Sequence, residues 1–123
     1  MSTNSPEKRE LRAALITAGR HLLAEAGLAG LSLRAVTRQA GVSATAAYRY
    51  FADREHLLAA IATSGVWELT ADLEAADRLG VDKLQDQACA YIRFAVANPA
   101  LYRLIFGPER LLSLIHISEP TRP

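Results

Sequence analysis

The stretch "GVSATAAYRYF", residues 41–51, gathers side chains suited to contacts with a negatively charged partner. Tyr48, Arg49 and Tyr50 are consecutive, and each can donate a hydrogen bond. Hydroxyl and guanidinium donors on an exposed helix are typical of contacts with phosphate oxygens. The same stretch contains apolar residues, so part of it must face a hydrophobic core.

Helix start and stop signals surround this stretch. Ser32 precedes "LRAVTRQA", Gly41 follows it, and Ser43 precedes "ATAAYRYF". Serine caps helix N-termini, and glycine commonly ends helices. The sequence therefore predicts helices at 33–40 and 44–51 with a three-residue turn between them. This is the pattern of a helix-turn-helix unit, and an ordinary helical hairpin is the alternative.

Helical spacing divides these residues into two faces. The predicted inward residues are Val36, Ala40, Val42, Ala47 and Phe51. The predicted outward residues are Ala44, Thr45, Tyr48 and Arg49, with Ala46 and Tyr50 at the margins. A free-standing hairpin does not require exposed tyrosines beside an arginine, whereas phosphate contacts do. The pattern favours the DNA-binding form.

The rest of the chain is predicted to be helical, which gives an all-α fold class. A first helix begins with Ser5 as its cap and Pro6 at its first position, and it ends at Gly27. Asp53 caps a long fourth helix, and Asp82 caps a fifth. The apolar residues expected to pack from the fourth helix are Leu57, Leu58, Ile61, Val66 and Leu69. A sixth helix, 99–106, has Asn98 as its predicted cap, and Gly107-Pro108 ends it.

Composition fits a globular domain with a core. Of the 123 residues, 50% are hydrophobic and 22% are charged. Residues 1–56 contain eight Lys or Arg and five Asp or Glu, whereas residues 57–111 contain five and seven. The basic front half suits a polyanion partner. Cys89 is the single cysteine, so no internal disulfide forms, and its apolar surroundings in sequence predict a buried thiol.

Residues 31–62, "LSLRAVTRQAGVSATAAYRYFADREHLLAAIA", resemble the N-terminal DNA-binding domain of the TetR/AcrR family of bacterial transcriptional regulators. The shared features are the Gly-Val-Ser turn, the tyrosine-rich run ending in Phe51, and the acidic and basic start of the next helix. The resemblance covers about residues 9–70. A shorter stretch, "YIRFAVANPALYRLIFG" at 91–107, is similar to a subgroup of the family with a WHG-type C-terminal domain.

The resemblance implies that the helix at 43–51 lies in the DNA major groove. The implied DNA-contacting residues are Arg34, Ser43, Ala44, Thr45, Ala46, Tyr48, Arg49, Tyr50 and Arg54. Ser43 and the two tyrosines contact the DNA backbone, and residues 44–46 face base edges. Arg34 reaches DNA from the preceding helix, and Arg54 anchors the flanking strand.

The helix-turn-helix unit departs from the family pattern at two positions. Its outward face, which we call the reading surface (Ala44, Thr45, Tyr48 and Arg49), is also distinctive. Thr37 stands where alanine is common, and Ala47 stands where leucine is frequent. The outward face has no Gln, Asn or Lys for bidentate base contacts, which leaves Arg49 as its only long donor. Methyl groups of residues 44–46 are therefore expected to contact thymine methyls, and DNA shape is expected to contribute to recognition.

The second half of the chain carries most of the aromatic residues. Five of them are candidates for lining a small-molecule cavity: Trp67, Tyr91, Phe94, Tyr102 and Phe106. Plain core packing is the alternative, because aromatic residues at helical spacing are common in cores.

The final residues, "LSLIHISEPTRP" at 112–123, resemble the translation of a sequencing-library adapter, and we expect them to be a non-native tail on an incomplete reading frame. The expected organisation is a flexible arm at 1–8, a DNA-binding domain at 9–54, a partial regulatory domain at 55–111, and this tail. His116 then belongs to no site.

No catalytic or cofactor-binding pattern is present in the sequence. His21 and His56 lie on separate helices, and no HExxH, CxxC or glycine-rich phosphate loop occurs. We predict a cytoplasmic, ligand-responsive transcriptional regulator. It is expected to be a repressor that binds operator DNA as a homodimer and responds to a small-molecule effector. We expect it to have no cofactor, no enzymatic activity and no association with a membrane. The alternative is a helical ligand-binding or protein-interaction module that keeps the helix-turn-helix shape without binding DNA.

Overall fold

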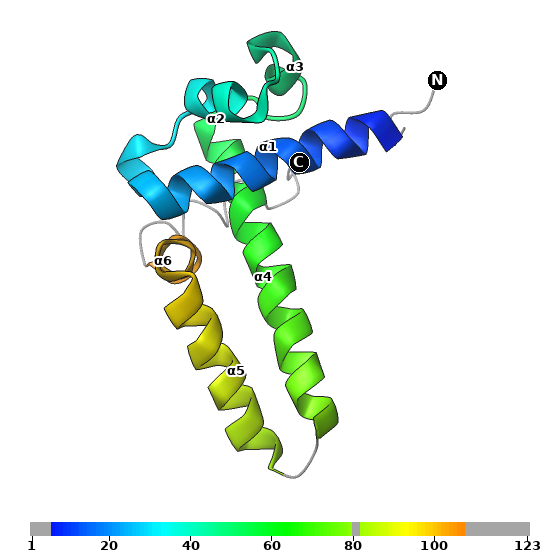
Figure 1. Ribbon diagram of the computed structural model, residues 1–123, viewed down its shortest axis with the longest axis vertical. Coiled ribbons are helices and arrows are strands. Elements are labelled where there is room, and N and C mark those ends of the chain that lie inside the picture. Colours follow the sequence, from blue (N-terminus) through cyan, green and yellow to red (C-terminus); the bar gives the residue numbers. More distant parts are fainter. Residues whose placement is uncertain (1–5, 80–81, 108–123) are drawn as a thin grey trace, which may run out of the picture.

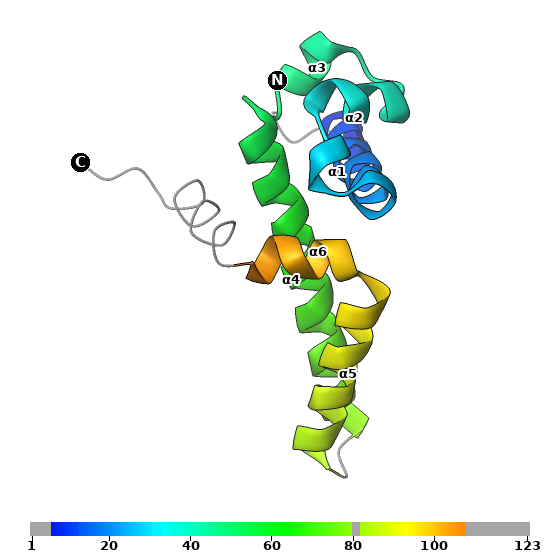
Figure 2. The same ribbon diagram turned by 90° about the vertical axis from the view of Figure 1, so that its left-hand side faces the viewer.

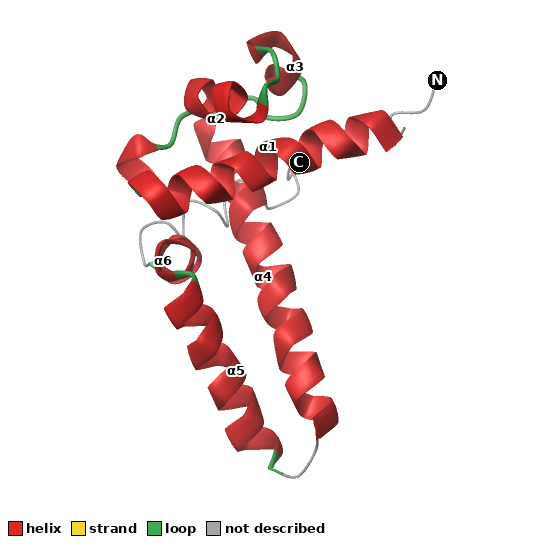
Figure 3. Cartoon of the chain, in the orientation of Figure 1, coloured by secondary structure: helices red, strands yellow, loops and turns green. Residues whose placement is uncertain are grey.

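The computed structural model describes residues 6–79 and 82–107, and every regular element in these ranges is helical. This confirms the all-α fold class (Figure 3). The elements are α1 (Pro6–Ala26), a short 3-10 helix η1 (Leu28–Gly30), α2 (Leu33–Ala40), α3 (Ala44–Tyr48), α4 (Arg54–Leu79), α5 (Lys83–Ala97) and α6 (Pro99–Phe106).

The long helix α4 connects two groups of helices. Figure 1 shows α1, α2 and α3 gathered at one end of α4, while α5 runs back beside its other part. α6 crosses α4 between these groups (Figure 2) and also contacts α1. Helix α4 therefore contacts α1 at the end of the molecule that carries α2 and α3, and it contacts α5 and α6 farther along.

The predicted signals set both ends of α2 and the start of α3. The Ser32 hydroxyl accepts the Ala35 N–H at 3.0 Å, and the Ser43 hydroxyl accepts the Ala46 N–H at 3.1 Å. Gly41 ends α2 in the left-handed region, with φ 71° and ψ 29°. Glycine adopts this conformation without the steric cost that other residues meet. The turn between the two helices is thus the predicted one.

The hydrophobic core runs from the helix-turn-helix end into the α5–α6 end. At the first end its buried members include Leu15, Val36, Ala47, Phe51, Leu57, Leu58 and Ile61. At the second end they include Phe94, Leu101, Leu104 and Ile105. A Cβ on Gly65 would lie 2.8 Å from Ile105 Cδ1, so the absence of a side chain on Gly65 lets α6 approach α4 closely.

Helix α3 is shorter than predicted. It ends at Tyr48 instead of residue 51, because the N–H groups of Arg49 and Tyr50 donate to the carbonyls of Ala46 and Ala47, three residues earlier. This tighter pattern is common at helix ends, where it satisfies carbonyls that have no helical partner. The last residues of the predicted recognition helix therefore form a turn.

α1 begins at Pro6, as the sequence predicts, so Glu7 and Lys8 belong to its first turn and not to the flexible arm expected at 1–8. The start of α6 differs from the prediction. Asn98 precedes α6 but does not cap it with its side chain. Its Nδ2 instead donates to the Phe94 carbonyl at 3.1 Å, which completes the end of α5. The predicted cap Ser5, the stop residue Pro108 and the tail 112–123 lie outside the described residues.

Two side chains that we expect to pack inward are exposed. Cys89 lies on the surface of α5, and Val66 on α4 is 45% exposed. Each directly neighbours a buried residue, Ala90 and Gly65 respectively. Consecutive residues of an α-helix point about 100° apart, so a neighbour of a buried position readily faces solvent. The prediction of a buried thiol is therefore wrong.

Candidate nucleic-acid interface

The outward face of α3 forms one continuous exposed surface with the turn that follows it. Ala44, Thr45, Tyr48 and Arg49 are all exposed, and Tyr48 keeps 58% of its surface in contact with solvent. The opposite face is anchored, because Ala47 is fully buried. The structure therefore divides these residues as helical spacing predicts.

The first turn of α3 is held in place by its serine cap. Ser43 is exposed, but its hydroxyl oxygen already accepts the Ala46 N–H. Ala46 is half-buried, so it lies at the margin of the exposed surface. This cap fixes the direction in which Ala44 and Thr45 project.

Tyr50 lies at the margin of this surface. It is half-buried and packs against the hydrophobic core, whereas Tyr48 projects into solvent. The cause is the turn at residues 49–50, which redirects the chain after α3 ends. Tyr50 thus has the marginal position that helical spacing predicts, and Tyr48 is the more exposed of the two tyrosines.

Two arginines extend the positive charge beyond α3. Arg34 is exposed in the first turn of α2, at the predicted position. Arg12 of α1 places its guanidinium carbon 5.5 Å from the centre of the Phe51 ring. A cation over an aromatic face is a stabilising contact. Arg12 carries no signal in the sequence, because its spacing on α1 does not indicate that it meets the end of the helix-turn-helix unit.

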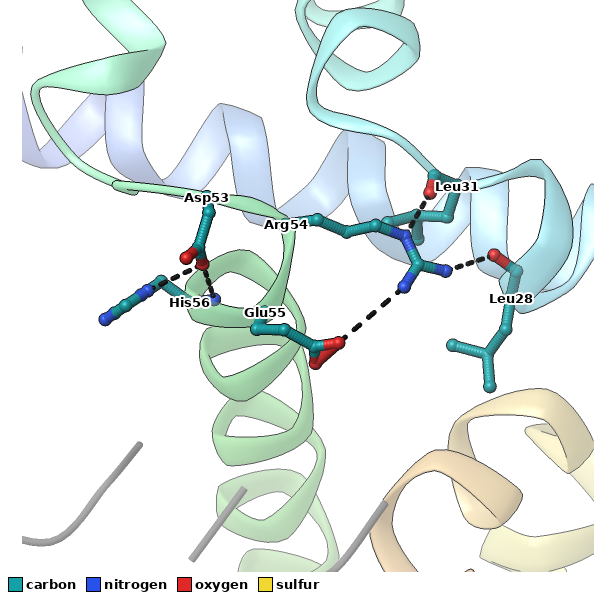
Figure 4. A network of polar contacts seen from close by, with 6 residues as sticks. All are labelled: Leu28, Leu31, Asp53, Arg54, Glu55 and His56. Carbon is teal, nitrogen blue, oxygen red and sulfur yellow. Dashed lines mark hydrogen bonds and ion pairs between the residues drawn. The ribbon is translucent and has the colours of Figure 1, made fainter. Parts of the chain in front are cut away.

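Arg54 has partners inside the chain. Its Nε–H donates to the Leu31 carbonyl at 2.7 Å, and a second nitrogen donates to the Leu28 carbonyl (Figure 4). The remaining nitrogen lies 3.8 Å from a Glu55 carboxylate oxygen. These contacts turn the Arg54 guanidinium toward the loop before α2. The expected contact of Arg54 with a flanking DNA strand stays a prediction.

The start of α4 has a second polar contact. Asp53 accepts the His56 N–H at 2.9 Å and lies 2.7 Å from the His56 ring nitrogen Nδ1 (Figure 4). Hydrogen bonds from the His56 side chain and backbone lower the pKa of the Asp53 carboxyl from its ordinary value. Asp53 is therefore the predicted N-cap of α4 and stays ionised to a lower pH than a free aspartate.

The five candidate cavity-lining aromatic residues have different surroundings. Phe94 is buried in the core, whereas Trp67 is 71% exposed on α4. Tyr91, Tyr102 and Phe106 form a cluster, with ring centres 4.9–6.0 Å apart. The Tyr91 hydroxyl donates to the Tyr102 hydroxyl at 3.0 Å, and this hydrogen bond raises the pKa of Tyr91.

An open groove lies where α1 meets the junction of α5 and α6. Its volume is about 240 Å³, and its polar walls are Arg20, Asn98 and Arg103. Arg20 also forms an ion pair with Glu68 of α4 at 3.1 Å. None of the five candidate aromatic residues lines this groove, and its lining residues carry no shared pattern in the sequence.

Two features are absent from the described parts of the chain. No helix within 6–79 or 82–107 is long and apolar enough to cross a membrane. Among the same residues, no three His, Cys, Asp or Glu side chains gather where they could hold a metal ion.

Residues 15–61 match the family described as bacterial regulatory proteins, tetR family. The HTH-type transcriptional regulator Rv1816 of Mycobacterium tuberculosis is 33% identical over 105 residues, which cover 81% of this chain and 45% of that protein. The HTH-type transcriptional regulator Mb1846 of Mycobacterium bovis matches with the same identity and coverage. The chain therefore spans less than half the length of these relatives.

Solved structures show the same arrangement of helices. A protein with unknown function from Rhodococcus sp. RHA1 has a TM-score of 0.70 and 35% identity, with 86% of this chain and 59% of that chain covered. A TetR family transcription regulator from Marinobacter aquaeolei VT8 has a TM-score of 0.68 and 21% identity, with coverages of 89% and 63%. The second likeness establishes the fold alone.

Proposed function

The chain belongs to the tetR family of bacterial regulatory proteins, and on this premise we propose that it regulates transcription by binding operator DNA through α3. The observation that carries the proposal is the exposed surface of Ala44, Thr45, Tyr48 and Arg49 opposite the buried Ala47. A short helix held from behind by the core and exposed in front is the geometry that enters a major groove.

The proposed contacts fall into two groups. Tyr48, Ser43 and Arg34 contact phosphates, and these contacts fix the position of the helix-turn-helix unit, here called the head, on the duplex. Ala44 and Thr45 face base edges, and their methyl groups contact thymine methyls. Ala46 contributes from the margin, and Arg49 serves either a base or a phosphate. A thymine-rich half-site follows from this arrangement, together with a contribution from DNA shape.

Tyr50 and Arg54 are left out of the proposed contact set. Tyr50 packs against the core, and the Arg54 guanidinium is bonded to backbone carbonyls. The proposed DNA-contacting set is therefore smaller than the one that the family resemblance implies.

The regulation that we propose is repression by a homodimer in the cytoplasm. A dimer with two-fold symmetry binds a palindromic site, with half-sites spaced by one helical turn or a multiple. A small-molecule effector in the C-terminal part changes the spacing of the two heads by tilting α4. The half-exposed cluster of Tyr91, Tyr102 and Phe106 is the proposed place for an aromatic or apolar effector to contact.

Selection of duplexes from a random library by the purified chain tests the DNA contacts. The expected product is a thymine-rich half-site, and replacing one contacted thymine by uracil removes one methyl contact and weakens binding about threefold. Recovery of guanine-rich half-sites whose binding depends on Arg49 would contradict the proposed readout.

The salt dependence of binding separates DNA recognition from the alternative of a protein-interaction module. Phosphate contacts release counterions, so affinity for the selected duplex falls steeply as salt rises. The alternative predicts no selected sequence and no such dependence, because a module that binds proteins or ligands does not displace the counterions of DNA.

A further inference from the structure

Arg54 joins the two ends of the helix-turn-helix unit. It is the first residue of α4, and its side chain reaches the loop 28–31, which leads into α2 (Figure 4). The bonded residues Arg54 and Leu31 are 23 positions apart in sequence. The side chain therefore bridges the segment entering α2 and the segment that follows α3.

The guanidinium suits this position because of its shape. Nε–H and one terminal nitrogen donate to two different carbonyls, those of Leu31 and Leu28, while the other terminal nitrogen faces Glu55. A planar group with donors in fixed directions can hold two separate acceptors at once. A lysine ammonium is a single point of charge at the end of a flexible stem, so it cannot reproduce this pair of contacts.

The loop that Arg54 holds packs Leu31 into the core, but its 3-10 turn has no side-chain hydrogen bond at its start. The 3-10 turn η1 follows Gly27, at φ 70°, and has no side-chain cap hydrogen bond. Its backbone bonds are the Gly30 N–H to the Gly27 carbonyl at 3.2 Å and the Leu31 N–H to the Leu28 carbonyl at 3.3 Å. Leu31 is buried and directly precedes the cap of α2. The position of this loop in space therefore determines the position of the first turn of α2.

We propose that Arg54 is a positioning residue for DNA recognition, which clamps both ends of the α2–α3 unit to α4 and contacts no phosphate itself. The inference rests on the proposed DNA-binding function. Because Arg54 links the loop before α2 to the start of α4, the α2–α3 unit and α4 move as one rigid body. Any tilt of α4 then reorients the exposed face of α3, and the loop before α2 does not absorb the movement.

The test compares Arg54→Lys and Arg54→Ala with Arg34→Lys and Arg34→Ala, measured on the selected duplex over a range of salt. Arg34 is the matched control because it is an exposed arginine of the same unit, with a proposed phosphate contact. Both Arg54 variants are expected to bind about tenfold more weakly than the wild type, with an unchanged salt slope. Arg34→Ala is expected to lower the slope by about 0.9, and Arg34→Lys to restore binding.

Hydrogen exchange of the free chain gives a second readout that needs no DNA. The Leu31 amide is expected to exchange faster in both Arg54 variants, while exchange in α5 stays as in the wild type. All binding is measured well below the unfolding temperature of each variant, so a role limited to stability leaves affinity unchanged and contradicts the proposal.

The outcomes distinguish failure of the proposed positioning role of Arg54 from failure of the proposed DNA-binding function. If Arg54→Lys binds normally, or Arg54→Ala lowers the salt slope as Arg34→Ala does, Arg54 contacts phosphate and the inference is overturned. Unchanged exchange at Leu31 also overturns it. If the wild type itself shows no salt-dependent binding to any duplex, the proposed function fails, while the exchange result still decides whether the clamp exists.

Discussion

Gly41, in the turn before α3, provides a prediction whose size follows from its backbone. Its φ of 71° lies in the left-handed region, and a Cβ placed there would have no heavy atom within 4 Å. Gly41→Ala therefore adds backbone strain without a clash. The strain costs about 1–2 kcal/mol. Alanine also restricts the conformations of the unfolded chain, which raises the free energy of unfolding by about 0.4–1 kcal/mol. The expected net loss in the free energy of unfolding is about 1 kcal/mol.

Urea unfolding followed by far-UV circular dichroism measures this loss. Gly41→Asn is the matched comparison, because asparagine visits the left-handed region more readily than alanine. The expected order of stability is wild type, then Gly41→Asn, then Gly41→Ala. An alanine variant as stable as the wild type, or an asparagine variant less stable than the alanine variant, would refute the assignment of this turn.

Two further predictions concern Asp53 and Cys89. Because the folded pKa of Asp53 is lowered, its stabilising contribution is complete above the ordinary aspartate pKa of about 3.9 and is lost as the pH falls through the folded value. The urea midpoints of the wild type and Asp53→Ala should therefore differ at neutral pH and converge in acid, and a constant difference would contradict this. Cys89 is exposed, so it should react with a thiol reagent in the folded chain as readily as in urea, and a need for urea would show that it is buried.

The local signals of the helix-turn-helix unit could be predicted because they act over a few residues. Ser32, Gly41 and Ser43 each act on a backbone group no more than four positions away, so their residue types suffice to set the helix ends. The division of α3 into exposed and buried faces follows from helical spacing alone. Ala47 accordingly lies inward and Tyr48 outward.

The roles of Tyr50 and Arg54 could not be predicted in this way. Tyr50 depends on the residue at which α3 stops, and no single strong stop signal occurs between Tyr48 and Asp53. Arg54 bonds to carbonyls more than twenty positions away. Every residue offers a carbonyl, so no side-chain pattern marks the acceptors. An exposed arginine and one bonded within the chain therefore look alike in sequence.

The second half of the chain shows a similar limit. α4 carries apolar residues on more than one side, so its sequence does not say which of them meets α5 and α6. The exposure of Trp67 could therefore not be predicted, because it depends on how α5 and α6 pack against α4. The cluster of Tyr91 and Tyr102 depends on the angle between α5 and α6, which also lies beyond helical periodicity.

One negative charge on the exposed face of α3 tests most directly whether this helix enters the major groove. Ala44→Glu introduces it at the first position of α3, where a glutamate suits the helix N-terminus and should leave folding intact. Ala71→Glu is the control, since Ala71 is exposed on α4 and the net charge changes equally. If α3 enters the major groove, Ala44→Glu abolishes binding to the selected duplex and Ala71→Glu binds nearly as the wild type does. Equal affinity of the two variants would contradict the central claim.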